Sequence, residues 1–401
     1  MPKNLDIDVT SLETINVIMA GHIDHGKTTL LYKLTGKWTD THSEELKRGI
    51  TIKLGYADLI LYKDKDTYTR EAKGTPVRYI SFVDAPGHEM LMATMLSGAA
   101  IVDAAILVVA ANEGIKPQTR EHLVALQAKK ITQVIIVQNK IDLATKEQTL
   151  KNYQEIKTLI KGTFAENAPI IPISAQQDIN LDKLYQALAE ISVPQRNLKD
   201  NPLFVIARSF DINRPGTNPE KLHGAVLGGT LKQGTLKVGD EIEIKPGMMI
   251  KEANQIHYRT LKTKIASLYK GQYNVKEITP GGSVAIETEL DMALGKTDAL
   301  SGCVASTFGL PEISFAIKMH FSLFKEILGS QQQMKVEPLK TNETLMLSVN
   351  TSVTVGIVKT IRGQEVELNL KIPIVPFKGE NVALARNVNN HWRLIGHGEI
   401  I

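Results

Sequence analysis

The stretch Gly21–Thr28 (GHIDHGKT) has the spacing G-x-x-x-x-G-K-T, which is typical of a phosphate-binding loop. It follows the β-branched run Ile15–Met19 and precedes a helical pattern over Thr28–Leu34. Small residues in such a loop let consecutive backbone N–H groups curl around phosphate oxygens, and the helix N-terminus adds partial positive charge. A glycine turn that binds nothing would have the same local sequence, so the interpretation depends on motifs further along the chain.

From Thr14 to about Glu190, apolar β-rich runs alternate with helical patterns. Ala105–Ala110 is apolar on both faces, as a buried parallel strand requires. This alternation predicts an α/β domain with a mostly parallel, doubly wound sheet and a ligand at the carboxyl ends of the strands. The expected strands are Ile15–Met19, Gly55–Tyr62, Tyr79–Val83, Ala104–Ala110, Val134–Val137 and Ile170–Ile173, and the expected helices include Gln118–Lys129, Lys146–Gly162 and Leu181–Glu190.

The second half of the chain has a different pattern. Ser192–Pro202 is polar, carries a proline near each end and is typical of a linker. Beyond it, short strand patterns alternate with glycine turns and helical periodicity is nearly absent, which predicts small antiparallel barrels. A softer break falls near Gly309–Pro311. We therefore expect an α/β phosphate-loop (P-loop) domain over residues 1–200 and two all-β barrel domains over 201–310 and 311–401.

The composition is that of an ordinary globular protein of 401 residues, with 43% hydrophobic and 22% charged residues. The net charge of +4 permits a nucleic-acid partner without arguing for one. Residues 1–14 lack the apolar core of a signal peptide and no run reaches the length of a membrane span, so we expect a soluble protein without a membrane partner. Cys303 is the sole cysteine, which excludes a disulfide within the chain and favours a cytoplasmic setting.

Three residues predict a magnesium and phosphate site. Lys27 would reach the β- and γ-phosphates, and the Thr28 hydroxyl would ligate Mg²⁺. Thr51, between the loop and the next motif, would complete the Mg²⁺ shell. Alone, Thr51 is one polar residue in a β-prone run, and its position along the chain favours a role in a first nucleotide switch.

Asp84–His88 (DAPGH) supplies a D-x-x-G motif directly after a predicted strand. Asp84 would hold Mg²⁺ through water, while the Gly87 N–H would sense the γ-phosphate, so that loss of this phosphate releases the loop. An Asp-Pro-Gly turn without any ligand is common. Its place behind a phosphate loop favours the second switch of a nucleotide-dependent protein.

Asn139–Asp142 (NKID) follows the predicted strand Val134–Val137 and matches the N-K-x-D guanine motif. A carboxylate at Asp142 can accept hydrogen bonds from the guanine N1–H and 2-amino group. Adenine lacks this donor pair, so a buried carboxylate at this position is expected to reject it. Ser174–Gln176 (SAQ), after the strand Ile170–Ile173, fits a last base-contacting loop, although only its position supports this match. The alternative is that both segments are only polar loops that follow strands and bind no base. Together with the phosphate loop and the D-x-x-G motif, they predict GTP or GDP as the ligand.

With these motifs in order, the chain resembles the translational GTPases, and among them the gamma subunits of the archaeal and eukaryotic translation initiation factor 2. The broader likeness rests on Gly21–Leu30 (GHIDHGKTTL), Arg48–Ile52 (RGITI), Asp84–His88 and Asn139–Asp142. The finer likeness rests on Trp38–Lys53, Pro117–Leu126, Gly162–Ser174, Arg208–Lys221, Val238–Gly247 and Trp392–Gly398. It runs from about Glu13 to Ile401 and implies a G domain followed by two β-barrels.

The resemblance implies functional residues at matching positions. His88 is similar to the catalytic histidine that orients the attacking water, and Ile23 and Ile50 to the apolar pair that screens it. Asp24 and Gly49 match positions associated with an additional Mg²⁺, although Asp24 could equally cap the loop. The residues expected to bind GTP are Asp24, His25, Gly26, Lys27, Thr28, Thr29, Asp84, Gly87, Asn139, Lys140, Asp142, Ser174, Ala175 and Gln176.

The resemblance also implies partners. Family members bind initiator methionyl-tRNA in the GTP state, assemble with an alpha and a beta subunit, and deliver the tRNA to the small ribosomal subunit, where GTP hydrolysis releases it. Tyr56 is the candidate for stacking near the terminal adenosine or methionine, and a half-buried strand tyrosine is the alternative. The lysine-rich segment over residues 251–276 would contact tRNA phosphates or form only a solvated face.

One departure from the family concerns zinc. Family members usually carry a knuckle with two pairs of cysteines between the first switch and the D-A-P-G motif. Here Leu61–Pro76 contains neither Cys nor His and is typical of a charged hairpin. A structural zinc site needs four thiolate or imidazole ligands, so we expect no zinc.

Two other functions stay open at this point. One is an elongation-type GTPase that carries aminoacyl- or selenocysteinyl-tRNA. The other is a non-translational regulatory GTPase that acts purely as a binding switch. Binding of different charged tRNAs in the presence of GTP would distinguish the three functions.

Overall fold

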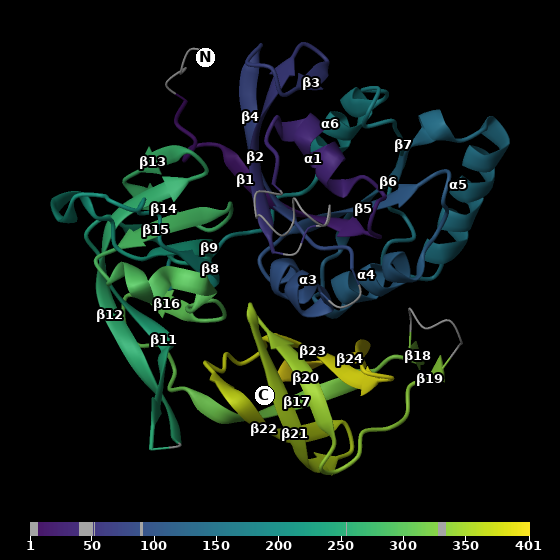
Figure 1. The fold of residues 1–401 in the computed structure, drawn as a ribbon. Coiled ribbons are helices and arrows are strands. Elements are labelled where there is room, and N and C mark those ends of the chain that lie inside the picture. The colour runs from purple at the N-terminus through teal and green to yellow at the C-terminus, as the bar shows by residue number, and fades with distance from the viewer. Residues whose placement is uncertain (1–6, 40–50, 52, 89–90, 254, 328–333) are drawn as a thin grey trace. The chain divides into compact units, whose positions relative to one another are not determined.

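The structure, a computed structural model, describes residues 7–39, 51, 53–88, 91–253, 255–327 and 334–401 (Figure 1). Contacts between residues divide the chain into two compact units. One unit holds the described residues up to 16 together with 58–81 and 193–310, and the other holds 17–57, 82–192 and 311–401. Within the described ranges, no helix is both long enough and apolar enough to cross a membrane.

The first half of the chain forms an α/β fold around one seven-stranded sheet. Its elements are β1 (Glu13–Gly21), α1 (Lys27–Thr35), β2 (Gly55–Asp64), β3 (Thr67–Thr69), β4 (Thr75–Asp84), α3 (Met92–Ala99), β5 (Ala104–Ala110), α4 (Pro117–Ala128), β6 (Gln133–Asn139), the 3-10 turn η2 (Ile141–Leu143), α5 (Lys146–Ile160), β7 (Ile170–Pro172) and α6 (Leu181–Glu190). The strand order is β3-β2-β4-β1-β5-β6-β7, with parallel pairing from β1 through β7. Figure 1 shows α1 and α6 on one side of the sheet and α3 and α4 on the other.

Local sequence explains where several of these elements begin and end. The fully apolar run Ala104–Ala110 is buried along its whole length in β5. A capping box starts α5, because Thr145 Oγ1 accepts from Gln148 N at 3.2 Å and Gln148 Oε1 accepts from Thr145 N at 2.9 Å. The expected charged hairpin is confirmed, since β2 and β3 pair in antiparallel register with Tyr62 opposite Thr69. The sequence did not predict α3, which is only eight residues long and apolar around most of its circumference.

The segment after the linker forms an antiparallel barrel. Its strands are β8 (Leu203–Phe210), β9 (Val226–Gln233), β10 (Leu236–Lys237), β11 (Glu241–Glu252), β12 (Gln255–Lys270), β13 (Tyr273–Val275), β14 (Glu277–Ile278), β15 (Val284–Thr288) and β16 (Val304–Ser306), with 3-10 turns η3 (Pro219–Lys221) and η4 (Met292–Asp298). The order β11-β16-β8-β9-β15-β12 closes through pairing of β11 with β12. Phe204, Leu268 and Ile286 are fully buried in its core.

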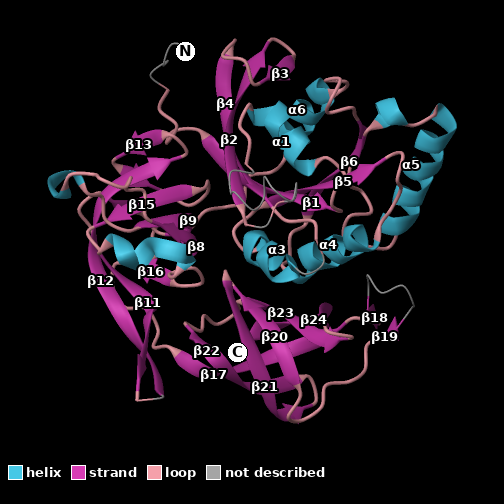
Figure 2. Ribbon diagram, in the orientation of Figure 1, coloured by secondary structure: helices cyan, strands magenta, loops and turns pink. Residues whose placement is uncertain are grey.

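The last part of the chain is a second closed antiparallel barrel, in the order β17-β22-β21-β20-β23-β24. Its strands are β17 (Ser314–Leu323), β18 (Glu326–Ile327), β19 (Met334–Lys335), β20 (Thr344–Val349), β21 (Ser352–Arg362), β22 (Glu365–Ile374), β23 (Asn381–Val388) and β24 (His391–Ile400). Figure 2 shows the α-helices gathered around the first sheet and strands through both barrels. The predicted fold class, an α/β P-loop domain followed by two all-β barrels, is confirmed; the boundaries at residues 200 and 310 stay predictions.

Candidate functional site

The phosphate loop joins the end of β1 to the start of α1, as the sequence predicts. Gly26 has a φ of 87°, a left-handed conformation that favours glycine, and a Cβ there would lie 2.5 Å from Asn139 Nδ2. A Cβ on Gly21 would lie 2.3 Å from the Val108 carbonyl oxygen of β5. The loop can therefore approach both neighbours only because these two positions lack side chains.

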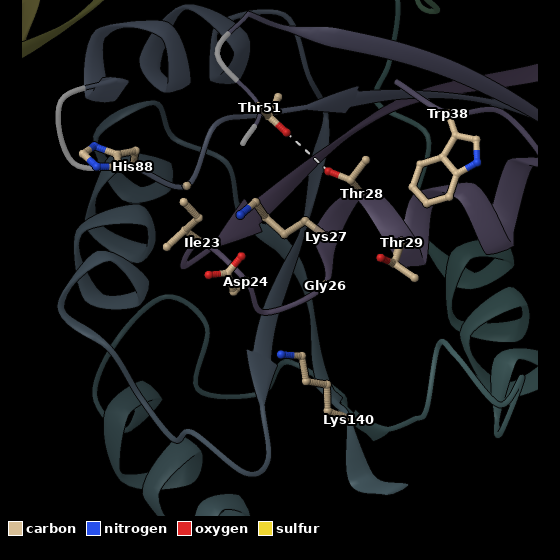
Figure 3. A pocket seen from close by; sticks show the side chains of 11 residues that line it. Ile23, Asp24, Gly26, Lys27, Thr28, Thr29, Trp38, Thr51, His88 and Lys140 are labelled. Carbon is tan, nitrogen blue, oxygen red and sulfur yellow. Dashed lines mark hydrogen bonds between the residues drawn. The ribbon is translucent and has the colours of Figure 1, made fainter. Parts of the chain in front are cut away.

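A pocket of about 400 Å³ opens above this loop (Figure 3). It combines the loop with residues of both predicted switches and of the guanine motif. The residues that line it are Ile23, Asp24, Gly26, Lys27, Thr28, Thr29, Trp38, Thr51, Gly87, His88 and Lys140. The structure thus brings together motifs that are separated by more than a hundred residues, at the carboxyl ends of β1 and β4 where the fold predicts a ligand.

Oxygen atoms from four segments meet at one side of the pocket. Thr28 Oγ1 donates to Asp84 Oδ2 at 2.9 Å and lies 3.3 Å from Thr51 Oγ1. Thr39 Oγ1 also donates to Asp84 Oδ2, at 2.7 Å. Hydroxyl and carboxylate oxygens are the protein ligands that suit Mg²⁺. The donor set formed here by Thr28, Thr51 and Asp84 therefore fits a magnesium ion.

Lys27 and Lys140 supply positive charge to the pocket. The Lys27 ammonium lies within the loop and donates to the His22 carbonyl oxygen at 2.8 Å. Lys140 has a φ of 61°, and its Nζ donates to Glu113 Oε1 at 3.1 Å. Two ammonium groups beside the phosphate loop and the start of α1 make the pocket suited to a phosphorylated anion.

Asn139 connects the guanine motif to two other loops. Its Nδ2 donates to the His25 carbonyl oxygen of the phosphate loop at 3.0 Å, and its Oδ1 accepts from Ala175 N at 3.1 Å. Ser174 is buried, and its Oγ accepts from Gln177 N at 3.1 Å. The predicted base-contacting loop is therefore fixed to the phosphate loop through one asparagine side chain.

Two other residues predicted to bind the base do not line the pocket. Asp142 is exposed on η2 and does not line the pocket. Gln176 is also exposed, and its carbonyl oxygen accepts from Lys33 Nζ at 3.2 Å. The expectation that the Asp142 carboxylate is buried is wrong, because the residue is exposed and its carboxylate is accessible to a ligand.

The histidine predicted to orient water, His88, is one of the residues that line the pocket. In the view of Figure 3 the Ile23 side chain is drawn between the His88 ring and the Lys27 amine. Asp24 is exposed in the loop with a φ of 61°. Gly49 and Ile50, predicted respectively to contact a second magnesium and to screen His88, lie outside the described residues. Tyr56 is half-buried on β2 and does not line the pocket.

Two buried histidines, His25 and His122, stabilise the phosphate loop. His122 on α4 is 1% exposed, and its Nδ1 accepts from Gly21 N at 2.8 Å, so the neutral ring carries its proton on Nε2. Burial lowers the pKa of His122 to about 3. Burial likewise lowers the pKa of His25 to about 4, and its Nδ1 lies 3.3 Å from the Val108 carbonyl oxygen. His25 is therefore uncharged at neutral pH, and its ring packs inside the protein beside the Val108 carbonyl group of β5.

Sequence reasoning missed three residues of the site: Trp38, Thr39 and His122. Trp38 is 52% exposed, lines the pocket and stacks on Tyr32 with ring centroids 4.4 Å apart. The sequence could have indicated Trp38, because a large apolar indole directly precedes a polar segment. Neither Thr39 nor His122 has a local signal, because the first reaches Asp84 and the second reaches Gly21 only after folding.

Comparison with known proteins assigns the chain to a family. The model of the elongation factor Tu GTP binding domain matches residues 12–194, and that of initiation factor eIF2 gamma, C terminal, matches 315–400. Translation initiation factor 2 subunit gamma from Archaeoglobus fulgidus is 51% identical, with 100% of this chain and 97% of the relative covered. The same subunit from Thermoplasma volcanium is 50% identical, with 96% and 97% covered.

Solved structures of two elongation factors share the fold. A bacterial selenocysteine-specific elongation factor, EF-Sec, matches with a TM-score of 0.77 at 23% identity, over 97% of this chain and 58% of that chain. Elongation factor SelB from Methanococcus maripaludis, in complex with the GTP analogue GppNHp, matches with a TM-score of 0.73 at 24% identity, over 97% and 79%. At such identities the likeness concerns the fold alone. Sequence identity of about 50% over nearly the whole chain is much stronger evidence than this likeness of fold. It shows that this chain is a translational GTPase belonging to the family of translation initiation factor 2 gamma subunits.

Proposed function

We propose that this chain, with GTP bound, holds initiator methionyl-tRNA and delivers it to the small ribosomal subunit, and that GTP hydrolysis releases the tRNA. In this proposal it works as one subunit of a factor that also contains an alpha and a beta subunit, in the cytoplasm together with ribosomes. The name shared by its relatives, subunit gamma of translation initiation factor 2, supports both the initiation step and the assembly.

One observation supports a GTP-dependent switch most directly. Side-chain oxygens of Thr28, Thr51 and Asp84, from the phosphate loop and the two switch motifs, lie within one hydrogen-bonded cluster. Thr28, Thr51 and Asp84 would hold a Mg²⁺ ion, which would supply positive charge to neutralise the phosphates. Loss of the γ-phosphate would then loosen two segments at once, which changes the surface that a tRNA meets.

The chain's own residues would have distinct roles. The Lys27 ammonium would bind the β- and γ-phosphates, and the Gly87 N–H would donate to the γ-phosphate. His88 would orient the attacking water, since positioning and charge stabilisation carry most of the rate of phosphoryl transfer. Asp142 would accept hydrogen bonds from guanine, while Asn139 would keep the base-binding and phosphate loops together.

Further parts of the proposal concern residues beyond this cluster. Asp24 would contribute to an additional Mg²⁺ site together with Gly49, and Thr29, Lys140, Ser174, Ala175 and Gln176 would surround the nucleotide. Tyr56 would stack near the aminoacyl end of the tRNA. We also propose domains over residues 1–200, 201–310 and 311–401, and a protein without zinc, because Leu61–Pro76 contains no thiol or imidazole.

Filter binding of charged tRNA to the full chain tests the function. With GppNHp we expect binding of initiator methionyl-tRNA to be at least about tenfold tighter than with GDP, because only the γ-phosphate orders both switches. Thr51→Val should remove this difference. Thr158→Val, on the outer face of α5, is the matched control and should retain it.

Two outcomes would contradict the proposal. Equal affinity for elongator and initiator methionyl-tRNA would favour an elongation-type carrier. Absence of tRNA binding in every nucleotide state, with and without the alpha subunit, would favour a regulatory switch that acts on other partners.

A further inference from the structure

We infer that Arg393, in the C-terminal barrel, is a positioning residue for the phosphate loop and slows nucleotide release. It acts through Glu121 and His122, which are neighbours on α4, and through the backbone N–H of Gly21. The inference rests on the proposed nucleotide site and adds a residue from outside the nucleotide-binding motifs.

The first contact in this series joins the barrel to α4. Arg393 Nη1 forms an ion pair with Glu121 Oε1, and the two side chains are only 12% and 4% exposed. A carboxylate buried this deeply needs its charged partner, and the pair is held in one geometry rather than moving in solvent. The position of α4 is therefore tied to strand β24, which carries Arg393.

The second contact joins α4 to the phosphate loop. Consecutive residues on a helix point about 100° apart, so Glu121 can face the barrel while His122 faces the end of β1. His122 Nδ1 accepts from Gly21 N at 2.8 Å, and the imidazole is buried. Any rotation or shift of α4 moves this acceptor relative to the first glycine of the loop.

Gly21 has little room to absorb such a shift. It lies opposite Val108 in the parallel pairing of β1 with β5, so close that a Cβ would be 2.3 Å from the Val108 carbonyl oxygen. Because interiors are densely packed, displacement is passed on to the loop that follows. The N–H groups of that loop would bind the phosphates, and their alignment determines how fast the nucleotide leaves.

A second ion pair, between the segment that follows α4 and strand β24, provides a matched control. Lys130, just after α4, pairs with Glu399 of β24 at 2.9 Å, but both side chains are about half exposed. Exposed pairs contribute little, and this one has no connection to His122. Glu399→Gln therefore removes a contact between the segment after α4 and the barrel without disturbing the proposed series.

Release of N-methylanthraniloyl-GDP from the full chain, followed by stopped-flow fluorescence, tests the inference. Arg393→Met and Glu121→Gln should each speed release about tenfold, the change expected when a hydrogen bond to a charged group is lost. Glu399→Gln should stay within about twofold of the unmodified chain. The double variant Arg393→Met/His122→Gln should release no faster than the faster single variant, because both changes interrupt one series of contacts.

Three results would overturn the inference. One is a release rate within about twofold of normal for Arg393→Met when circular dichroism shows a folded chain. Another is a double variant whose acceleration equals the product of the two single effects, which would make the residues independent. If Arg393→Met fails to fold, Arg393→Met/Glu121→Leu removes both charges, and an unchanged release rate there would overturn it as well.

The proposed nucleotide site can fail separately. If the unmodified chain does not bind the labelled GDP at all, the assignment of the pocket is wrong. Binding with normal release in all Arg393 variants contradicts only the positioning role.

Discussion

Protonation of His122 should destabilise the protein as the pH falls below about 6.5. The imidazole is buried and accepts from Gly21 N, and burial lowers its pKa to about 3. The unfolded chain binds a proton with the ordinary pKa of about 6.5, so acid favours unfolding. The stability due to this group is thus fully present above pH 6.5 and is lost progressively down to about pH 3.

The magnitude follows from the difference between the two pKa values. Each pKa unit corresponds to about 1.4 kcal/mol, and at pH 5 the folded-state imidazole is still neutral while the unfolded one is almost fully charged. Between pH 7 and pH 5 the free energy of unfolding should fall by about 2 kcal/mol through His122 alone. His122→Gln removes this titration, so the stability gap between the unmodified chain and the variant should narrow by about 2 kcal/mol over that interval.

Urea unfolding at pH 7, 6 and 5 measures this gap, with the fluorescence of Trp38 as the probe in a Trp392→Phe background. Trp38 lies at the pocket, so its signal reports on the part of the chain that contains His122. His257→Gln, which replaces an exposed histidine on β12, is the control. A gap between the unmodified chain and His122→Gln that is constant from pH 7 to pH 5 would refute the reasoning.

Three further predictions concern the ligand site. Asp142→Asn should weaken GTP binding about 10- to 100-fold through loss of a charged acceptor and shift preference toward xanthosine triphosphate; competition binding that finds unchanged GTP affinity would remove the guanine assignment. His88→Ala should slow GTP hydrolysis about 100-fold or more with nucleotide affinity nearly intact, as measured by phosphate release and titration; a collapse of affinity would make His88 structural. Metal analysis of purified chain loaded with GTP should find magnesium, and stoichiometric zinc would contradict the hairpin interpretation of Leu61–Pro76.

Short-range patterns were enough for most of the fold. Apolar runs located β1, β5 and β6, and helical periodicity located α4, α5 and α6 to within a residue or two at each end. Glycine turns and the absence of helical periodicity predicted two barrels, and both are found. These signals work because strand and helix periodicity, turn residues and loop glycines act within a few positions along the chain.

Short-range patterns also located the motifs of the nucleotide site, but they did not identify the distant side chains that contact those motifs. The pocket is lined by Gly26, Lys27 and Thr28, as predicted. These residues are consecutive, so the local shape of one loop is enough to place them together. Strand order then brings Thr51 and Gly87 beside them, which the order of the motifs allowed us to expect.

Folding alone brought Thr39 to Asp84, His122 to Gly21 and Arg393 to Glu121. The last two pairs are 101 and 272 positions apart in the chain. No spacing rule covers such distances, because each contact depends on how strands order within the sheet and how a helix packs against a barrel. Local chemistry therefore specified the nucleotide loop, and packing of distant segments selected the side chains that hold it in place.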